Sequence, residues 1–142
     1  MTGEFTARLS GRFHGVLAWS RLDDLWARLR AAPEGWYVTM IGQPVKTPAP
    51  VSAEHFDRFI ADVDALLRKD HREDYCGIVY VDDPEQPAFV KIYDPNNLGS
   101  SCGGGGGTVP RWVISRMAPE PIEDAAPLPA NRLRWWQNLF GA

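Results

Sequence analysis

The chain has few cysteines, no long apolar run and no excess of positive charge. It contains only two cysteines in 142 residues, too few for the disulfide framework of a small secreted protein. No segment approaches the roughly 20 apolar residues of a membrane span, and the first residues lack the basic and apolar regions of a signal peptide. The formal net charge of −3 provides no overall positive field for a phosphate backbone. We therefore expect a cytoplasmic protein without a transmembrane segment that does not bind nucleic acid.

The residues that are present favour a folded domain. Hydrophobic residues make up 44% of the chain, including six tryptophans, which is enough to bury a core. Runs rich in β-branched and aromatic residues predict strands at residues 13–19, 36–41, 76–81, 88–93 and 111–117. Apolar positions at helical spacing predict one helix capped by Ser20 and a second capped by Ser52. The two runs around residues 82–87 predict an antiparallel hairpin.

The order of these elements predicts an α+β fold. Two helices are expected to pack on a mainly antiparallel sheet of four or five strands, within a single domain of residues 1–117. Residues 118–130 contain four prolines and three acidic residues, and they lack the apolar periodicity that would bury a face. We interpret them as a linker that leads to a tail of residues 131–142.

The tail has the pattern of a short amphipathic helix. Asn131 can cap it, and the apolar residues expected on its face, which we predict to bind a protein partner, are Leu133, Trp135, Trp136, Leu139 and Phe140. An isolated helix of this length is marginally stable in water and gains order by laying its apolar face in a groove. Two alternatives remain open: the tail folds back on its own domain, or it contacts a membrane surface, which its short apolar face disfavours.

A lone thiol lies beside a run of glycines at residues 99–107. The run lacks the Lys-Ser or Lys-Thr sequence of a phosphate-binding loop, and a strand rather than a helix is expected after it. Cys102 is a candidate nucleophile with His71 as its base. The residues that combine as a candidate metal site are His71, Cys76, Asp94 and Cys102. Because five consecutive glycines cost much entropy to order, a flexible connector is the favoured interpretation.

Two functions from different classes follow. The favoured hypothesis is a non-enzymatic accessory or adaptor protein, without cofactor or metal, whose Trp-rich tail docks a protein partner. The alternative is a redox or hydrolytic site that depends on a thiol or a metal and uses Cys102, Cys76 and His71.

Overall fold

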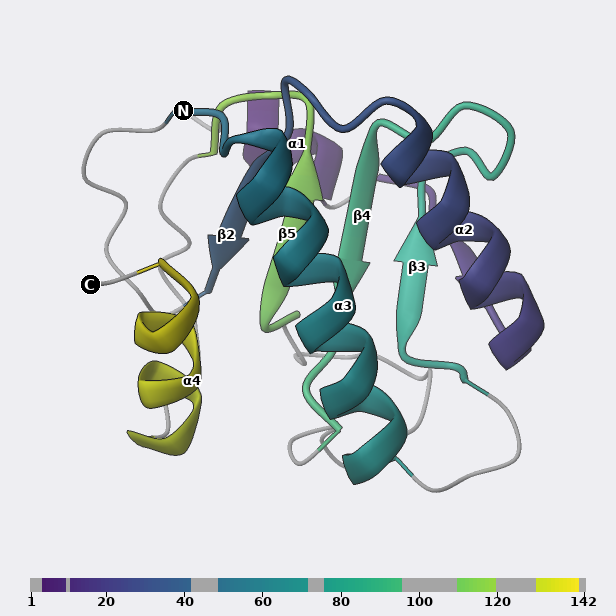
Figure 1. The fold of residues 1–142 in the computed structure, drawn as a ribbon. Coiled ribbons are helices and arrows are strands. Elements are labelled where there is room, and N and C mark those ends of the chain that lie inside the picture. Colours follow the sequence, from purple (N-terminus) through teal and green to yellow (C-terminus); the bar gives the residue numbers. More distant parts are fainter. Residues whose placement is uncertain are drawn as a thin grey trace.

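A five-stranded antiparallel sheet lies at the centre of the protein in the computed structural model of the chain (Figure 1). The structure describes residues 4–9, 11–41, 49–71, 76–95, 110–119 and 130–140. The helices are α1 (Glu4–Leu9), α2 (Trp19–Ala31), α3 (Ala53–Asp70) and α4 (Ala130–Phe140). The strands are β1 (His14–Val16), β2 (Tyr37–Met40), β3 (Val79–Val81), β4 (Phe89–Ile92) and β5 (Trp112–Ser115). Helices packed on this sheet confirm the α+β class.

The strands lie side by side in the order β1-β3-β4-β5-β2, so β1 and β2 form the two edges. The expected hairpin is confirmed, since β3 and β4 pair antiparallel with Val79 opposite Ile92. β3 is shorter than the sequence predicted. Gly77 has a φ of +69°, which takes the chain out of the extended conformation before the strand begins.

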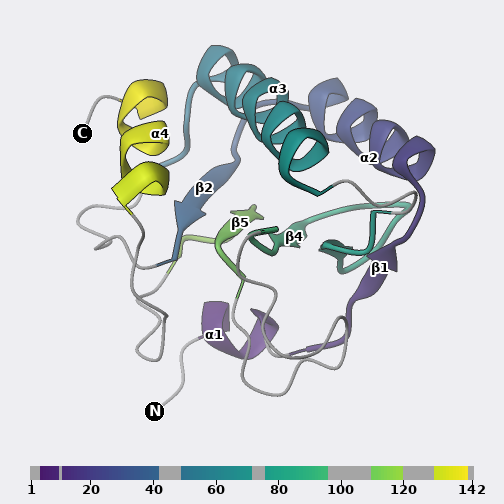
Figure 2. The same cartoon turned by 90° about the horizontal axis from the view of Figure 1, so that it is seen from below.

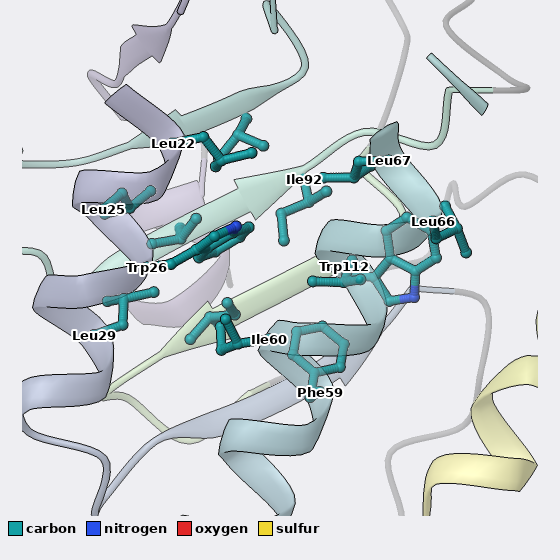
Figure 3. Packing of buried hydrophobic residues seen from close by; sticks show 14 of the residues in the cluster. Leu22, Leu25, Trp26, Leu29, Phe59, Ile60, Leu66, Leu67, Ile92 and Trp112 are labelled. Atoms are coloured by element: carbon teal, nitrogen blue, oxygen red, sulfur yellow. The ribbon is translucent and has the colours of Figure 1, made fainter. Parts of the chain in front are cut away.

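The helices α2 and α3 cover one face of the sheet, and α1 lies on the opposite face (Figure 2). The first face is a continuous apolar core (Figure 3). Its buried residues on α2 and α3 include Leu22, Leu25, Trp26, Leu29, Phe56, Phe59, Ile60, Val63, Leu66 and Leu67. These follow the helical spacing that the sequence predicted, and side chains such as Ile92 and Trp112 meet them from the sheet.

The second face has a smaller core that the sequence did not predict. Phe5 and Leu9 of α1 pack there with Phe89 and Val113 of the sheet. α1 has only six residues, too few to show a helical repeat in the sequence. Because both faces are covered at this point, all four residues of β5 are buried.

The start of α2 differs from the expectation. Residues 13–19 were predicted as strand, but β1 ends at Val16 and Trp19 is the first residue of the helix. The N-cap is Ala18, whose side chain makes no capping hydrogen bond, and Ser20 lies inside the helix. Core packing therefore fixes this helix start without a polar cap. At α3 the prediction is confirmed, since the Ser52 side chain accepts a hydrogen bond from the His55 backbone N–H at 3.1 Å.

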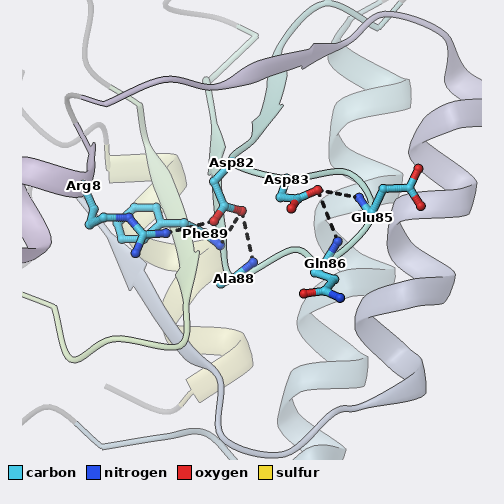
Figure 4. Close-up of polar contacts among 7 residues, drawn as sticks. All are labelled: Arg8, Asp82, Asp83, Glu85, Gln86, Ala88 and Phe89. Atoms are coloured by element: carbon cyan, nitrogen blue, oxygen red, sulfur yellow. Dashed lines mark hydrogen bonds and ion pairs between the residues drawn. The ribbon is translucent and has the colours of Figure 1, made fainter.

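Two aspartates organise the loop between β3 and β4 (Figure 4). Asp82 accepts a hydrogen bond from the backbone N–H of Phe89 at 3.1 Å and pairs with Arg8 of α1 at 2.9 Å. Asp83 accepts from the backbone N–H of Glu85 at 2.9 Å. The loop is thus held in one shape by its own side chains. None of the described helices is long and apolar enough to cross a membrane.

Candidate partner-docking site

Helix α4 lies beside α3, near the β2 edge of the sheet (Figures 1 and 2). It begins at Ala130, so Asn131 lies within the helix rather than capping it. Trp136 and Leu139 are buried, with 9% and 4% of their surface exposed. The other candidate binding residues, Leu133, Trp135 and Phe140, pack against the core but stay partly exposed. The tail therefore folds back on its own domain, one of the alternatives that the sequence left open.

Several aromatic rings join α4 to the domain. The ring of Phe59 lies 6.0 Å from that of Trp135, 6.4 Å from Trp136 and 6.3 Å from Phe140, measured between centroids. Trp135 also lies 5.4 Å from Trp112 of β5. Tilted and edge-on ring pairs of this kind contribute roughly 0.5–1.5 kcal/mol each beyond the area they bury. Phe59 and Trp112 thus form an aromatic seat for the helix.

A buried arginine fixes the first turn of α4. Arg132 is 5% exposed. Its Nε and Nη2 atoms each donate to a different oxygen of Asp94 at 2.9 Å, and Nη2 also donates to Asp70 at 3.0 Å. Burial lowers the pKa of Arg132, but the hydrogen bonds and charges of the two carboxylates raise it more, so the net shift is upward. The guanidinium is therefore held firmly in its charged form.

A second buried arginine lies at the same end of the sheet. Arg111 precedes β5, is 3% exposed, and donates from Nη1 to the backbone carbonyl of Ile41 at 2.6 Å. Burial lowers its pKa, Asp94 raises it, and Arg132 lowers it further, with a net downward shift. Asp94 thus acts electrostatically on two arginines, and the ends of β4, β5 and α4 share one buried charge cluster.

The far end of α4 has weaker links to α3. Arg58 donates from Nη2 to the backbone carbonyl of Asn138 at 3.2 Å. The rings of His55 and Phe140 lie 5.9 Å apart. These partners are exposed or half-buried, so this end adds less stability than the Arg132 end.

Sequence patterns did not identify the residues of the domain that contact α4. Asp94 was a candidate metal ligand, but the structure places its carboxylate on Arg132. Phe59 belonged to the expected apolar stripe of α3, and nothing in that pattern indicated that its ring would also contact α4. The only signal for Arg132 was its position one helical turn before Trp136, where an arginine shares a face with buried residues.

The described candidate residues, His71, Cys76 and Asp94, do not form a common metal-binding group. His71 caps the C-terminus of α3, with its ring 6.0 Å from that of Trp19. Cys76 is fully buried and unbridged. Burial raises the pKa of its thiol, although backbone hydrogen bonds oppose this shift. A raised pKa disfavours the thiolate that nucleophilic or metal chemistry needs. Cys102 lies outside the described residues, and within the described ranges no group of three or more His, Cys, Asp or Glu side chains is placed to hold a metal ion.

Comparisons with protein-family models, curated proteins and solved structures give no match. The function must be argued from the site.

Proposed function

We propose that the protein is a non-enzymatic accessory protein that docks a protein partner through helix α4. One observation carries the proposal: α4 has buried residues that anchor it and apolar residues that stay partly exposed. Trp136, Leu139 and the charged Arg132 are buried and anchor the helix, whereas Leu133 and Trp135 keep part of their surface open.

The partly exposed residues have the chemistry of an interface centre. Tryptophan is enriched among the residues that dominate binding energy, because a large rigid ring buries much area at low entropic cost. Phe140 adds a second partly exposed ring. The outer face of the helix carries exposed Arg134 and Gln137, which supply the polar rim typical of protein interfaces.

Anchoring also favours binding energetically. A free tail of this length would have to fold when it bound, and the ordering cost would be subtracted from the affinity. Here the Arg132 cluster and the aromatic seat hold the helix before any partner arrives. A helix that is already ordered loses less conformational entropy on binding. We propose the cytoplasm as the setting, because the chain has few cysteines, and a protein rather than nucleic acid as the partner, because the net charge is negative.

The test is site-specific photocrosslinking followed by reconstitution. A photoreactive amino acid is placed at Gln137 on the outer face of α4 and, as a matched control, at Ala65, an exposed position of α3. We expect one identified protein to be crosslinked from position 137 and not from position 65. With that protein purified, Trp135→Ala should weaken binding at least tenfold and Arg134→Ala much less. Because Trp135 also contacts Phe59, hydrogen exchange of residues 130–140 in the Trp135→Ala variant checks that α4 remains docked. Equal crosslinking from both positions, no adduct from position 137, or unchanged binding of the Trp135→Ala variant would contradict the proposal.

A further inference from the structure

A groove lies at the other edge of the sheet, away from α4. It has a volume of about 370 Å³ and is bounded by β1, α2 and the loop between β3 and β4. Val16, Leu25 and Val81 line it and are themselves buried. A volume of this size lies at the lower end of the range for ligand sites. The groove thus has an apolar floor.

Strand β1 forms the edge of the sheet beside this groove. It is the first strand in the sheet order, and among the described residues it pairs with β3 alone. His14 and Gly15 are exposed, and an open edge strand offers unpaired backbone groups to another strand. Leu17, which directly follows β1, is 63% exposed and is the one large hydrophobic side chain that is exposed among the described residues. A protruding apolar side chain and an apolar groove therefore belong to the same surface.

The rim of the groove carries both signs of charge. Arg21, Asp24 and Arg28 lie on α2, and Glu85 lies on the β3–β4 loop. The salt bridges within the described residues involve none of these four side chains. Arg28 instead donates to the backbone carbonyl of Glu85 at 3.3 Å. Charged groups at the rim are thus available to pair with a molecule that carries both positive and negative charges.

Hydrogen bonds within the β3–β4 loop hold the loop wall of the groove. The Asp83 carboxylate accepts from the backbone N–H groups of Glu85 and Gln86, and Asp82 fixes the other end of the loop (Figure 4). A binding surface whose wall is already ordered loses little entropy when it is occupied.

We propose that the occupant of this surface is a second copy of the chain. In a twofold dimer each patch meets an identical patch, so the patch must be complementary to itself. This patch is complementary to itself because Leu17, which lines the rim of the apolar groove, is exposed, and because Arg21 lies three residues before Asp24. Leu17 of each copy enters the groove of the other, Arg21 faces Asp24 of the second copy, and the two β1 strands extend the sheet. An acidic or basic peptide from another protein would meet a repelling charge at this rim.

The dimer leaves the α4 surface free. β1 and β2 are the opposite edges of the sheet, and α4 lies on the β2 side, far from the N-terminal end of α2 (Figures 1 and 2). The dimer and the docking of a partner on α4 are therefore independent of each other, and either can fail alone.

The test is sedimentation equilibrium of the full chain over about 1–100 µM, a range that covers dissociation constants of weak to moderate dimers. We expect a reversible monomer–dimer equilibrium. Leu17→Lys should weaken the dimer at least tenfold, and Ala65→Lys, a matched change at an exposed position of α3, should leave it unchanged. Thermal unfolding of both variants checks that the fold is retained.

Charge reversal makes the test specific for the pairing. Arg21→Asp and Asp24→Arg should each weaken self-association, because like charges then face each other across the twofold axis. An equimolar mixture of the two variants should form a heterodimer that is at least tenfold tighter than either homodimer. A wild-type chain that is monomeric at about 100 µM, a dimer that is insensitive to Leu17→Lys, or a mixture that fails to associate would overturn the proposal.

Discussion

Removing the Arg132 side chain should release α4 from the domain while the sheet stays folded. Hydrogen bonds to charged groups contribute roughly 1.5–3 kcal/mol each, and Arg132 makes such bonds to Asp94 and Asp70 at 2.9–3.0 Å. Breaking a buried ion pair by removing one partner costs about 3–5 kcal/mol. Arg111 remains near Asp94 and compensates part of its charge. We therefore expect the low end of this range, about 3 kcal/mol, for Arg132→Ala.

Hydrogen exchange measured by mass spectrometry separates local release from global unfolding. A loss of about 3 kcal/mol corresponds to roughly a 150-fold increase in the opening equilibrium. Amides in residues 130–140 should lose protection by about this factor, and amides of β4 and β5 should change far less. Arg134→Ala is the matched control, since Arg134 is exposed on the same helix, and it should change protection by less than about twofold.

A double-mutant cycle identifies the interaction responsible. Asp94→Asn should also loosen α4, and combining it with Arg132→Ala should give a coupling energy above about 1 kcal/mol. A change of less than about fivefold in the protection of α4 in Arg132→Ala would refute the view that this cluster anchors the tail. So would an equal loss of protection across the whole sheet.

Three further outcomes are expected. Ser52→Ala should lower the unfolding free energy by about 1 kcal/mol in denaturant titrations, because it removes the side-chain cap of α3; an unchanged midpoint would contradict that role. Burial raises the pKa of the Cys76 thiol in the folded protein. The contribution of this thiol to the free energy of unfolding is therefore fully present below the ordinary thiol pKa and is lost as pH rises through the raised pKa of the folded state. In a Cys102→Ser variant, a thiol reagent should therefore react with Cys76 slowly until denaturant is added, and rapid native labelling would show that the thiol is accessible. Gly35 has a φ of +85°, and an added Cβ would lie 3.0 Å from Nη1 of Arg116. Gly35→Ala should therefore lower the free energy of unfolding by about 1–2 kcal/mol, measured by thermal unfolding. An unchanged melting temperature would show that the backbone relaxes.

Much of the fold was predictable because its signals are local. The apolar repeat of α3 and the Ser52 cap lie within one segment, and the hairpin of β3 and β4 has its two halves a few residues apart. The start of α2 was wrong because a good local cap, Ser20, was outweighed by packing that buries Leu22 and draws Trp19 into the helix. Tertiary contacts override local preference in such cases.

The candidate site was predictable only in part. The amphipathic pattern of residues 131–142 indicated a helix with an apolar face, which α4 confirms. What that face meets depends on pairs far apart in the chain: Arg132 and Asp94 are separated by 38 residues, and Arg132 and Asp70 by 62. No local pattern links such residues, so an aspartate that anchors a tail has the same sequence signature as a candidate metal ligand.

The order of the sheet has a consequence for synthesis of the chain. The two strands that are made first, β1 and β2, end at opposite edges, and each pairs with a strand made much later. β2 ends at Met40 and its neighbour β5 begins at Trp112, so a ribosome adding about 5–20 residues per second leaves β2 without its neighbour for roughly 4–15 s. Until β3 and β4 have been made, α2 and α3 have no paired strands to cover. During synthesis the first half of the chain therefore exposes apolar residues that the finished sheet covers, and a fragment that ends before β3 should depend on chaperones or aggregate.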